Sequence, residues 1–242
     1  MFNIQRHKNN IRVVLNNGMI KQWNHLEIWE YSVCNLLPSN NLDDYFNNKS
    51  DYFKFKYHNI DIKLCGIREG NGDLAGVFLN NDYKFLEPEN GIIIDIGANI
   101  GDSSIYFALN NAKKVIALEP YPYSYNQALK NININNLNNK IVLLNAGYGE
   151  DSEIKIDENK ITNGSTALIS SNEGKKIKTY SLETLINNYN LDNIGRPNIR
   201  QLTIYIIFLP EIPVILSAIT MQLYATPMKN LYLTIFYASP VY

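Results

Sequence analysis

The stretch IIIDIGANIGDS, residues 92–103, decides the fold of this chain. Its three consecutive isoleucines form an apolar, β-branched run, which is typical of a strand buried on both faces of a parallel sheet. Gly97 and Gly101 follow, and glycine permits a tight turn and a close approach of a ligand to the backbone. Asp102 or Ser103 can then cap a helix. The stretch therefore predicts a strand, a turn and a helix, with a ligand crevice where the strand ends.

Beyond this turn, stretches with strand and helix patterns alternate along the chain. Such alternation is typical of an α/β fold in which helices cover both faces of a parallel sheet. We therefore predict a Rossmann-like α/β fold. The predicted strands cover residues 92–96, 114–118, 141–145, 153–156 and 176–179, and the predicted helices cover 102–110, 123–135 and 181–188.

The residues before the core predict an N-terminal extension. Apolar residues recur at helical spacing over 19–37, and Pro38 ends this run, so a helix is expected there. Residues 52–57 and 60–64 alternate apolar with polar side chains and predict a β-hairpin. The glycine-rich stretch 66–76 reads as a loop.

The turn after the first core strand favours S-adenosylmethionine (SAM) over a dinucleotide. The dinucleotide fingerprint starting at Gly97 would need glycines at positions 99 and 102, where this chain has Asn99 and Asp102. A carboxylate at a helix N-terminus repels a pyrophosphate, whereas SAM has no phosphate and carries a positive sulfonium. An NAD-dependent oxidoreductase is therefore the weaker hypothesis.

Glu119 ends the second predicted core strand, about twenty residues beyond the glycines, where an acidic side chain can accept hydrogen bonds from ribose hydroxyls. Asp95 and Glu119 are therefore expected to bracket one adenosyl ligand. A solvated loop carboxylate is the alternative interpretation of Glu119.

Three segments make the resemblance specific: IIIDIGANIGDSSIYFAL, VIALEPYPYSYNQALKNININN and LLNAGYGE. Together they resemble the FkbM family of SAM-dependent methyltransferases, over about residues 83–189. The resemblance implies a class I methyltransferase fold and O-methylation of a hydroxyl on a sugar, glycan or small molecule. It also implies a set of SAM contacts: Asp95, Gly97, Asn99 and Gly101 at the turn, Glu119 at the ribose, and Asn145 and Ala146 beside the adenine.

No residue identifies itself as the catalytic base. Methyl transfer needs an acceptor oxygen held close to the methyl group and usually a base that takes the hydroxyl proton. His58 and Asp73 are candidates, but a structural or surface role is the favoured interpretation of each.

The resemblance ends near residue 190. The family pattern continues with a fourth strand that ends in an acidic motif of the form K-[IM]-D-x-E-G-x-E, which is absent here. The apolar residues 197–242 have three interpretations: a shifted reading frame or premature end, a membrane-associated tail, or divergent core strands. Loss of the motif also leaves open an alternative function, a catalytically impaired remnant or SAM-binding module. The chain is predicted to divide into an N-terminal extension (1–82), a SAM-binding methyltransferase domain (83–196) and an atypical apolar C-terminal segment (197–242).

The composition limits the classes of ligand and binding partner that are expected. The formal net charge of −1 offers no basic excess for nucleic-acid binding. Cys34 and Cys65 lie far apart without a CxxC spacing, so neither a disulfide framework nor a metal site is expected. The polar N-terminus lacks an apolar signal region, and a cytoplasmic location is expected.

Overall fold

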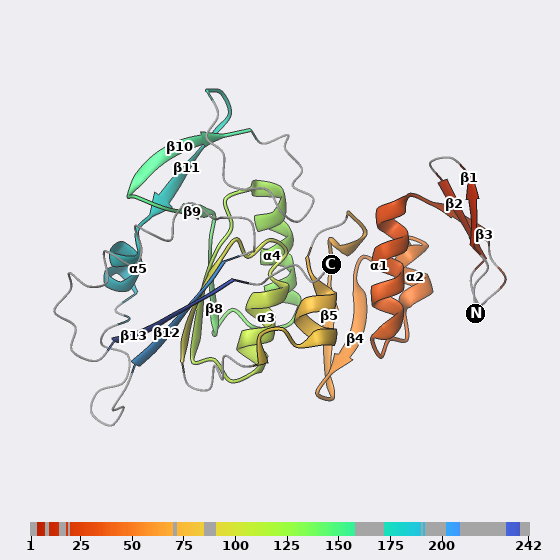
Figure 1. Cartoon of the computed structure of the whole chain (residues 1–242), viewed down its shortest axis with the longest axis horizontal. Helices are drawn as coiled ribbons and strands as arrows, with labels where there is room; N and C mark the ends of the chain where they lie inside the picture. Colours follow the sequence, from red (N-terminus) through yellow and green to blue (C-terminus); the bar gives the residue numbers. More distant parts are fainter. Residues whose placement is uncertain are drawn as a thin grey trace.

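The computed structural model describes most of the chain outside its C-terminal part. At one end of the elongated molecule lie the N-terminal elements, and at the other lies a parallel sheet with its covering helices (Figure 1). The described residues are 4–7, 10–14, 18, 20–69, 72–84, 91–157, 172–189, 191, 202–208 and 231–237.

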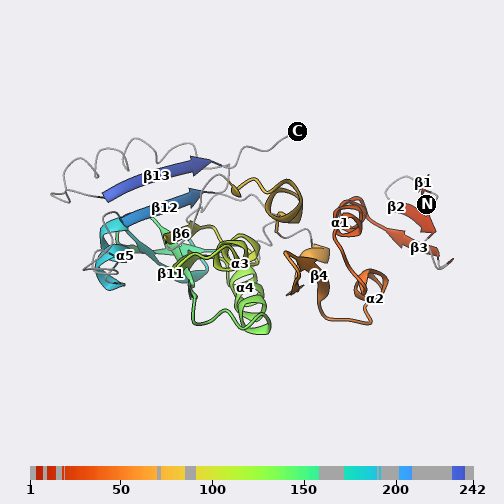
Figure 2. The ribbon, with the colours of Figure 1, turned by 90° about the horizontal axis from the view of Figure 1, so that it is seen from below.

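The central sheet is parallel throughout its described strands. Its spatial order is β13-β12-β6-β7-β8, and every neighbouring pair runs in the same direction. Figure 2 shows β13, β12 and β6 side by side. The strands are β6 (Ile92–Ile96), β7 (Lys114–Leu118), β8 (Ile141–Leu144), β12 (Leu202–Phe208) and β13 (Leu231–Tyr237). The predicted positions of β6, β7 and β8 are confirmed to within one residue.

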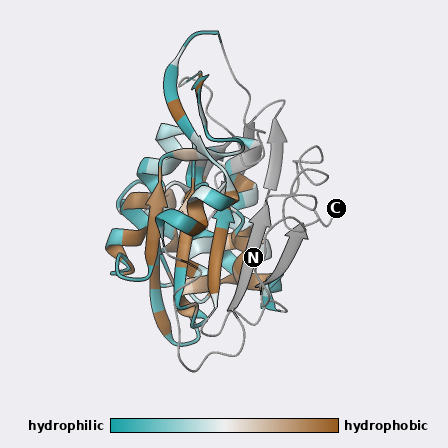
Figure 3. Cartoon of the chain, turned by 90° about the vertical axis from the view of Figure 1, so that its left-hand side faces the viewer, coloured by the Kyte–Doolittle hydropathy of each residue, from teal (hydrophilic) through white to brown (hydrophobic). Residues whose placement is uncertain are grey.

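Helices cover both faces of this sheet, as predicted. Ile93 and Val115 belong to the core cluster under α3 (Asp102–Leu109) and α4 (Pro122–Ile134). Ile94 and Ile116, their neighbours in sequence, belong to the cluster under α5 (Leu182–Asn188). Successive strand residues point to opposite faces, so a continuous apolar run fills both layers. The central strands are accordingly hydrophobic in Figure 3.

A smaller sheet lies beside the central one and carries α5. Its strands are β9 (Ala146–Tyr148), β10 (Ser152–Ile156) and β11 (Lys175–Tyr180). β11 pairs antiparallel with β10 and parallel with β9. The Ser181 side chain caps α5 by accepting a hydrogen bond from the Thr184 backbone amide at 3.2 Å. The predicted strands and helix of this segment are confirmed, whereas β9 was not predicted.

The N-terminal end differs from the single helix predicted over 19–37. The described parts of residues 4–23 form an antiparallel sheet of β1 (Ile4–His7), β2 (Asn10–Val14) and β3 (Ile20–Trp23). Helix α1 (His25–Leu36) starts only after Asn24, which forms a capping box with Glu27. Among the described residues, 20–24 of the predicted helix are therefore not helical, because pairing of β3 with β2 overrides local helical spacing.

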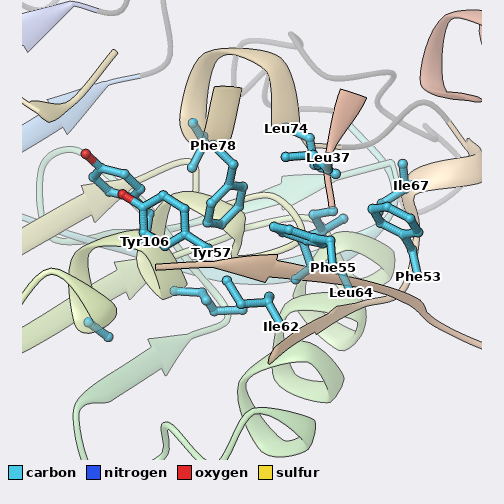
Figure 4. Packing of buried hydrophobic residues seen from close by; sticks show 14 of the residues in the cluster. Leu37, Phe53, Phe55, Tyr57, Ile62, Leu64, Ile67, Leu74, Phe78 and Tyr106 are labelled. Carbon is cyan, nitrogen blue, oxygen red and sulfur yellow. The ribbon is translucent and has the colours of Figure 1, made fainter. Parts of the chain in front are cut away.

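The hairpin is confirmed and packs on the core. β4 (Phe53–Tyr57) and β5 (Ile60–Leu64) are joined by His58 and Asn59, both with positive φ, as a two-residue hairpin turn requires. The aromatic side chains of β4 pack on one another and on helical neighbours (Figure 4). This cluster continues into β6, β7 and α3, and so crosses the predicted boundary between residues 82 and 83. That boundary stays a prediction.

The predicted loop 66–76 contains helical turns in its described parts. A short 3₁₀ turn covers Ile67–Glu69, and a π-helix covers Ala75–Asn80. Between α1 and these turns lies α2 (Leu42–Phe46), which buries Tyr45 and Phe46. The segment therefore packs on the core through its apolar residues, which glycine content alone did not indicate.

The apolar C-terminal stretch supplies sheet strands. β12 pairs in parallel with β6, from Ile204 opposite Ile92 to Phe208 opposite Ile96, and β13 pairs with β12. Of the three interpretations, the arrangement agrees with divergent core strands, since β-branched and aromatic residues favour strands. The acidic motif is absent from the sequence.

No helix within the described ranges has both the length and the apolar character that crossing a membrane requires. The longest described helix, α4, covers only the 13 residues Pro122–Ile134.

Candidate functional site

The turn after β6, residues 97–101 (hereafter the cofactor turn), has a backbone that side-chain-bearing residues rarely adopt. Gly97, Asn99 and Gly101 have φ values of 79°, 48° and 82°. The Gly97 and Ala98 amides donate to the Leu118 carbonyl at 2.9 and 3.0 Å, which fixes the turn to the end of β7. A Cβ on Gly101 would lie 3.3 Å from the Ala128 Cβ. Glycine at 101 thus serves both the turn and the close packing of α4.

Asp95 lies beneath this turn. Its carboxylate is 2% exposed and accepts hydrogen bonds from the hydroxyls of Ser103 at 2.8 Å and Ser104 at 2.5 Å. Burial raises the pKa of Asp95, while the two hydroxyls act in the opposite direction. Both partners lie in the first turn of α3, so Asp95 joins the end of β6 to the start of that helix. The prediction that it lies at the turn is confirmed in position, whereas its contact with SAM remains a prediction.

Glu119 lies directly after β7, against the same turn. One carboxylate oxygen accepts from the Asn99 amide at 2.8 Å and the other accepts from the Tyr121 amide at 2.9 Å. The residue is 4% exposed, so the solvated loop carboxylate of the alternative interpretation is wrong. Each oxygen retains a lone pair for a further donor, such as a ribose hydroxyl. The structure thus brings Glu119 and the cofactor turn together.

Asn145 and Ala146 follow β8 at the neighbouring strand end. The Asn145 side-chain amide donates to the carbonyls of Glu119 at 2.9 Å and Pro120 at 3.0 Å. Asn145 therefore braces the backbone beneath Glu119. Ala146 is buried in the cluster under α5 and pairs in register with Lys178 of β11. The suggested place of these residues beside an adenine remains a prediction.

The sequence did not reveal the full role of Asp102. Its side chain is 4% exposed and accepts from the backbone amide of Asp73 at 2.6 Å. Burial raises the pKa of Asp102 to about 7, although this hydrogen bond opposes the shift. Asp102 thus holds the segment before the π-helix against the start of α3. Its partner lies 29 residues away, so no local pattern could have found the contact.

Three buried carboxylates therefore surround the cofactor turn. None of Asp95, Asp102 and Glu119 takes part in the ion pairs found among the described residues. Burial raises the pKa of Glu119 to about 7, and the amides of Tyr121 and Asn99 offset part of that effect. Buried carboxylates without cationic partners favour a ligand that carries positive charge.

The cofactor turn also offers an unused acceptor. The Asn99 side-chain oxygen is buried and makes no hydrogen bond to the described residues, while Asn99 itself is 7% exposed. Such an atom costs free energy unless a ligand or water donates to it. SAM has hydroxyl and ammonium donors and a positive sulfonium. The acceptor oxygens at the turn therefore fit the donors and the positive charge of SAM.

The two candidate bases lie in different places. His58 is exposed at the tip of the β4–β5 hairpin, where its ring packs edge-on against Tyr57. Asp73 is also exposed, but its backbone is bonded to Asp102, and one carboxylate oxygen accepts from the Gly76 amide at 2.9 Å. Of the two, only Asp73 contacts a residue of the site. Neither contact identifies a base.

Comparison with protein families identifies the domain. Residues 95–202 match the family described as Methyltransferase FkbM domain, which confirms the resemblance found in the sequence. Residues 95–202 thus form an FkbM-type methyltransferase domain, which belongs to a SAM-dependent class of enzymes. No significant sequence match was found among curated proteins.

Local similarity was also found to several solved structures. Protein arginine methyltransferase 10 of Arabidopsis thaliana is 25% identical over 24% of this chain, with a TM-score of 0.23. Pyrococcus horikoshii TYW2, solved with MeSAdo, is 24% identical over 40%, with a TM-score of 0.30. The Methanocaldococcus jannaschii tRNA m1G37 methyltransferase is 23% identical over 38%, with a TM-score of 0.30. The matched segments span 17%, 37% and 28% of those chains.

Proposed function

We propose that this chain is a SAM-dependent methyltransferase that acts on a hydroxyl of a sugar, glycan or small molecule. The observation that carries the proposal is the Glu119 carboxylate, held by the Asn99 and Tyr121 amides at the carboxyl ends of β6 and β7. The FkbM match over residues 95–202 supports the same reaction class.

The chain's own residues would bind and orient the two reactants. When bound, SAM supplies an activated methyl group. Glu119 would accept from ribose hydroxyls, and the free Asn99 oxygen would accept from a second ligand donor. Asp95 and Asp102 would place negative potential near positive groups of the ligand. Holding the acceptor oxygen in line with the methyl group would supply most of the acceleration.

The first test is calorimetric titration of the full chain with SAM and with its demethylated product, S-adenosylhomocysteine (SAH). We expect micromolar binding in the unchanged protein. We expect Glu119→Ala to weaken it at least about tenfold, because a charged hydrogen-bond acceptor is lost. Glu183→Ala is the matched control, since Glu183 lies exposed on α5. A folded protein that binds neither compound would refute the proposal.

A second candidate function is a SAM-binding module without turnover. The observation that favours it is the end of β12, where Phe208 lies opposite Ile96 of β6. In the family pattern this strand ends in an acidic motif, which the sequence lacks. Release of SAH in the presence of a panel of glycosides and simple alcohols distinguishes the two functions. SAH binding without any such release would favour the module.

A further inference from the structure

Helix α4 presents two asparagines to the free edge of β5. The Asn131 side-chain oxygen accepts from the Cys65 amide at 2.7 Å, and its nitrogen donates to the Cys65 carbonyl at 3.1 Å. Asn135, one helical turn later, makes the same pair of bonds with Lys63, at 3.0 and 2.7 Å. Each amide side chain thus replaces one residue of a neighbouring strand.

The geometry follows from two periodicities. Residues two apart on an edge strand present their amides and carbonyls on the same side, and residues four apart lie on the same face of a helix. Lys63 and Cys65 therefore meet Asn131 and Asn135 in register. The arrangement gives hydrogen-bond partners to backbone groups at a covered sheet edge.

Asn131 makes one bond that Asn135 does not. Its side-chain nitrogen also donates to the carbonyl of Ile100 at 2.9 Å, inside the cofactor turn. Asn131 is fully buried, and both its oxygen and its nitrogen are used. The second bond of the Asn135 nitrogen goes instead to the Asn131 carbonyl, within α4.

The bond to Ile100 lies next to the residue of the cofactor turn that contacts Glu119. Ile100 directly follows Asn99, whose amide donates to Glu119, and directly precedes Gly101, whose amide donates to the Ala98 carbonyl at 2.7 Å. A fixed Ile100 carbonyl therefore restrains the peptide plane that it shares with the Gly101 amide, and through this plane it limits rotation of the preceding residues, including Asn99. Asn99 has a φ of 48°, which is unfavourable for a residue with a side chain and needs such restraint.

We propose that Asn131 is a positioning residue for the cofactor site, which couples the β4–β5 hairpin to the cofactor turn through the Ile100 carbonyl. The proposal rests on the proposed SAM site. Without the bond, the Asn99 amide points less steadily at Glu119, and the site binds its cofactor more weakly. Asn135, which holds the same strand from the same helix, has no such effect.

The experiment compares Asn131→Ala with Asn135→Ala in the full chain. Both variants lose two bonds to β5, so both are expected to lower the thermal midpoint. Only Asn131→Ala is expected to weaken SAH binding, by about tenfold, which matches the loss of one buried hydrogen bond. It is also expected to lose hydrogen-exchange protection at the Asn99 amide, which Asn135→Ala retains.

Equal SAH affinities in the two variants, together with equal protection at Asn99, would overturn the proposal. If Asn131→Ala does not fold, Asn131→Asp takes its place, because it keeps an acceptor for Cys65 and lacks the donor for Ile100. If the unchanged protein does not bind SAH, the proposed function fails. The exchange comparison at Asn99 then still decides whether Asn131 holds the turn.

Discussion

The cofactor turn and the inward-facing side chains of the β4–β5 hairpin are both buried, but they are held in different ways. Around the turn, carboxylates and hydroxyls bond to backbone and side-chain groups, with Asp95 and Glu119 almost completely buried. In the hairpin, Phe53 and Phe55 stack with ring centroids 5.4 Å apart. The Phe78 ring packs edge-on against Phe55, with centroids 5.1 Å apart. Polar contacts specify a geometry, whereas aromatic burial supplies most of the free energy of folding.

The largest expected effect is on the free energy of unfolding, and it distinguishes the hairpin from the cofactor turn. We expect Phe55→Ala to lower the free energy of unfolding by about 3 to 5 kcal/mol, because it removes a fully buried ring. Urea unfolding measures the loss. In the fraction that remains folded, SAH affinity should change by less than about threefold, since the ring contacts of Phe55 are with Phe53 and Phe78.

Lys56→Ala is the control for that experiment. Lys56 is exposed on the same strand, and surface changes of this kind are usually within about 0.5 kcal/mol. A loss of SAH affinity in Phe55→Ala as large as its loss of stability would show that the two regions are not separable.

The second prediction concerns pH. Burial raises the pKa of Glu119 and of Asp102 from the ordinary values of 4.5 and 3.8 to about 7. Between these limits the folded protein binds more protons than the unfolded chain, so the free energy of unfolding falls as pH rises. We expect each carboxylate to contribute a fall of about 2 to 3 kcal/mol from about pH 4.5 to 7, and a flatter curve above.

Glu119→Gln sharpens this test, because an amide does not titrate. Its stability should depend less steeply on pH over the same interval, with Glu183→Gln unchanged as the exposed control. Identical pH curves for Glu119→Gln and the unchanged protein would contradict the assignment of the slope to this carboxylate.

The third prediction concerns the charge of the ligand. Ionised Asp102 and Glu119 attract a sulfonium, which SAM has and SAH lacks. We expect the ratio of SAM affinity to SAH affinity to rise severalfold, about threefold or more, between pH 6 and pH 8. Calorimetry at both values measures it. A constant ratio would mean that neither carboxylate changes charge near the ligand.

The smallest expected effect isolates the packing at Gly101. Gly101→Ala and Gly18→Ala both place a side chain at a φ near 80°, but only the Cβ at 101 meets a neighbour, Ala128. We expect each to cost about 1 kcal/mol of backbone strain and Gly101→Ala to cost about 1 kcal/mol more. Thermal unfolding compares them, and equal losses would show that α4 moves freely away from the turn.

The central layer of the fold was predictable because its signals are local. Each of β6, β7 and β8 is a short, mainly apolar run, and Gly97, Pro120 and Asn145 lie within two residues of their ends. The predicted positions of Asp95, Gly97 and Glu119 followed from those strand ends, since parallel strands bring their carboxyl ends to one edge.

The N-terminal sheet was not predictable in this way. β3 lies in a segment whose apolar residues also fit helical spacing, and only its pairing with β2 decides between the two. The same holds for the apolar C-terminal stretch, where pairing with β6 places β12 beside the central strand of the sheet.

The sequence by itself determined the α/β class, the glycine turn and the acid after β7, because spacing along the chain encodes them. Only the tertiary structure decided which polar groups meet. Asp73 bonds to Asp102, and Asn131 bonds to Cys65 and Ile100, across separations of 29, 66 and 31 residues. Such contacts depend on how the layers pack, and a buried polar group requires its partner wherever the fold brings one.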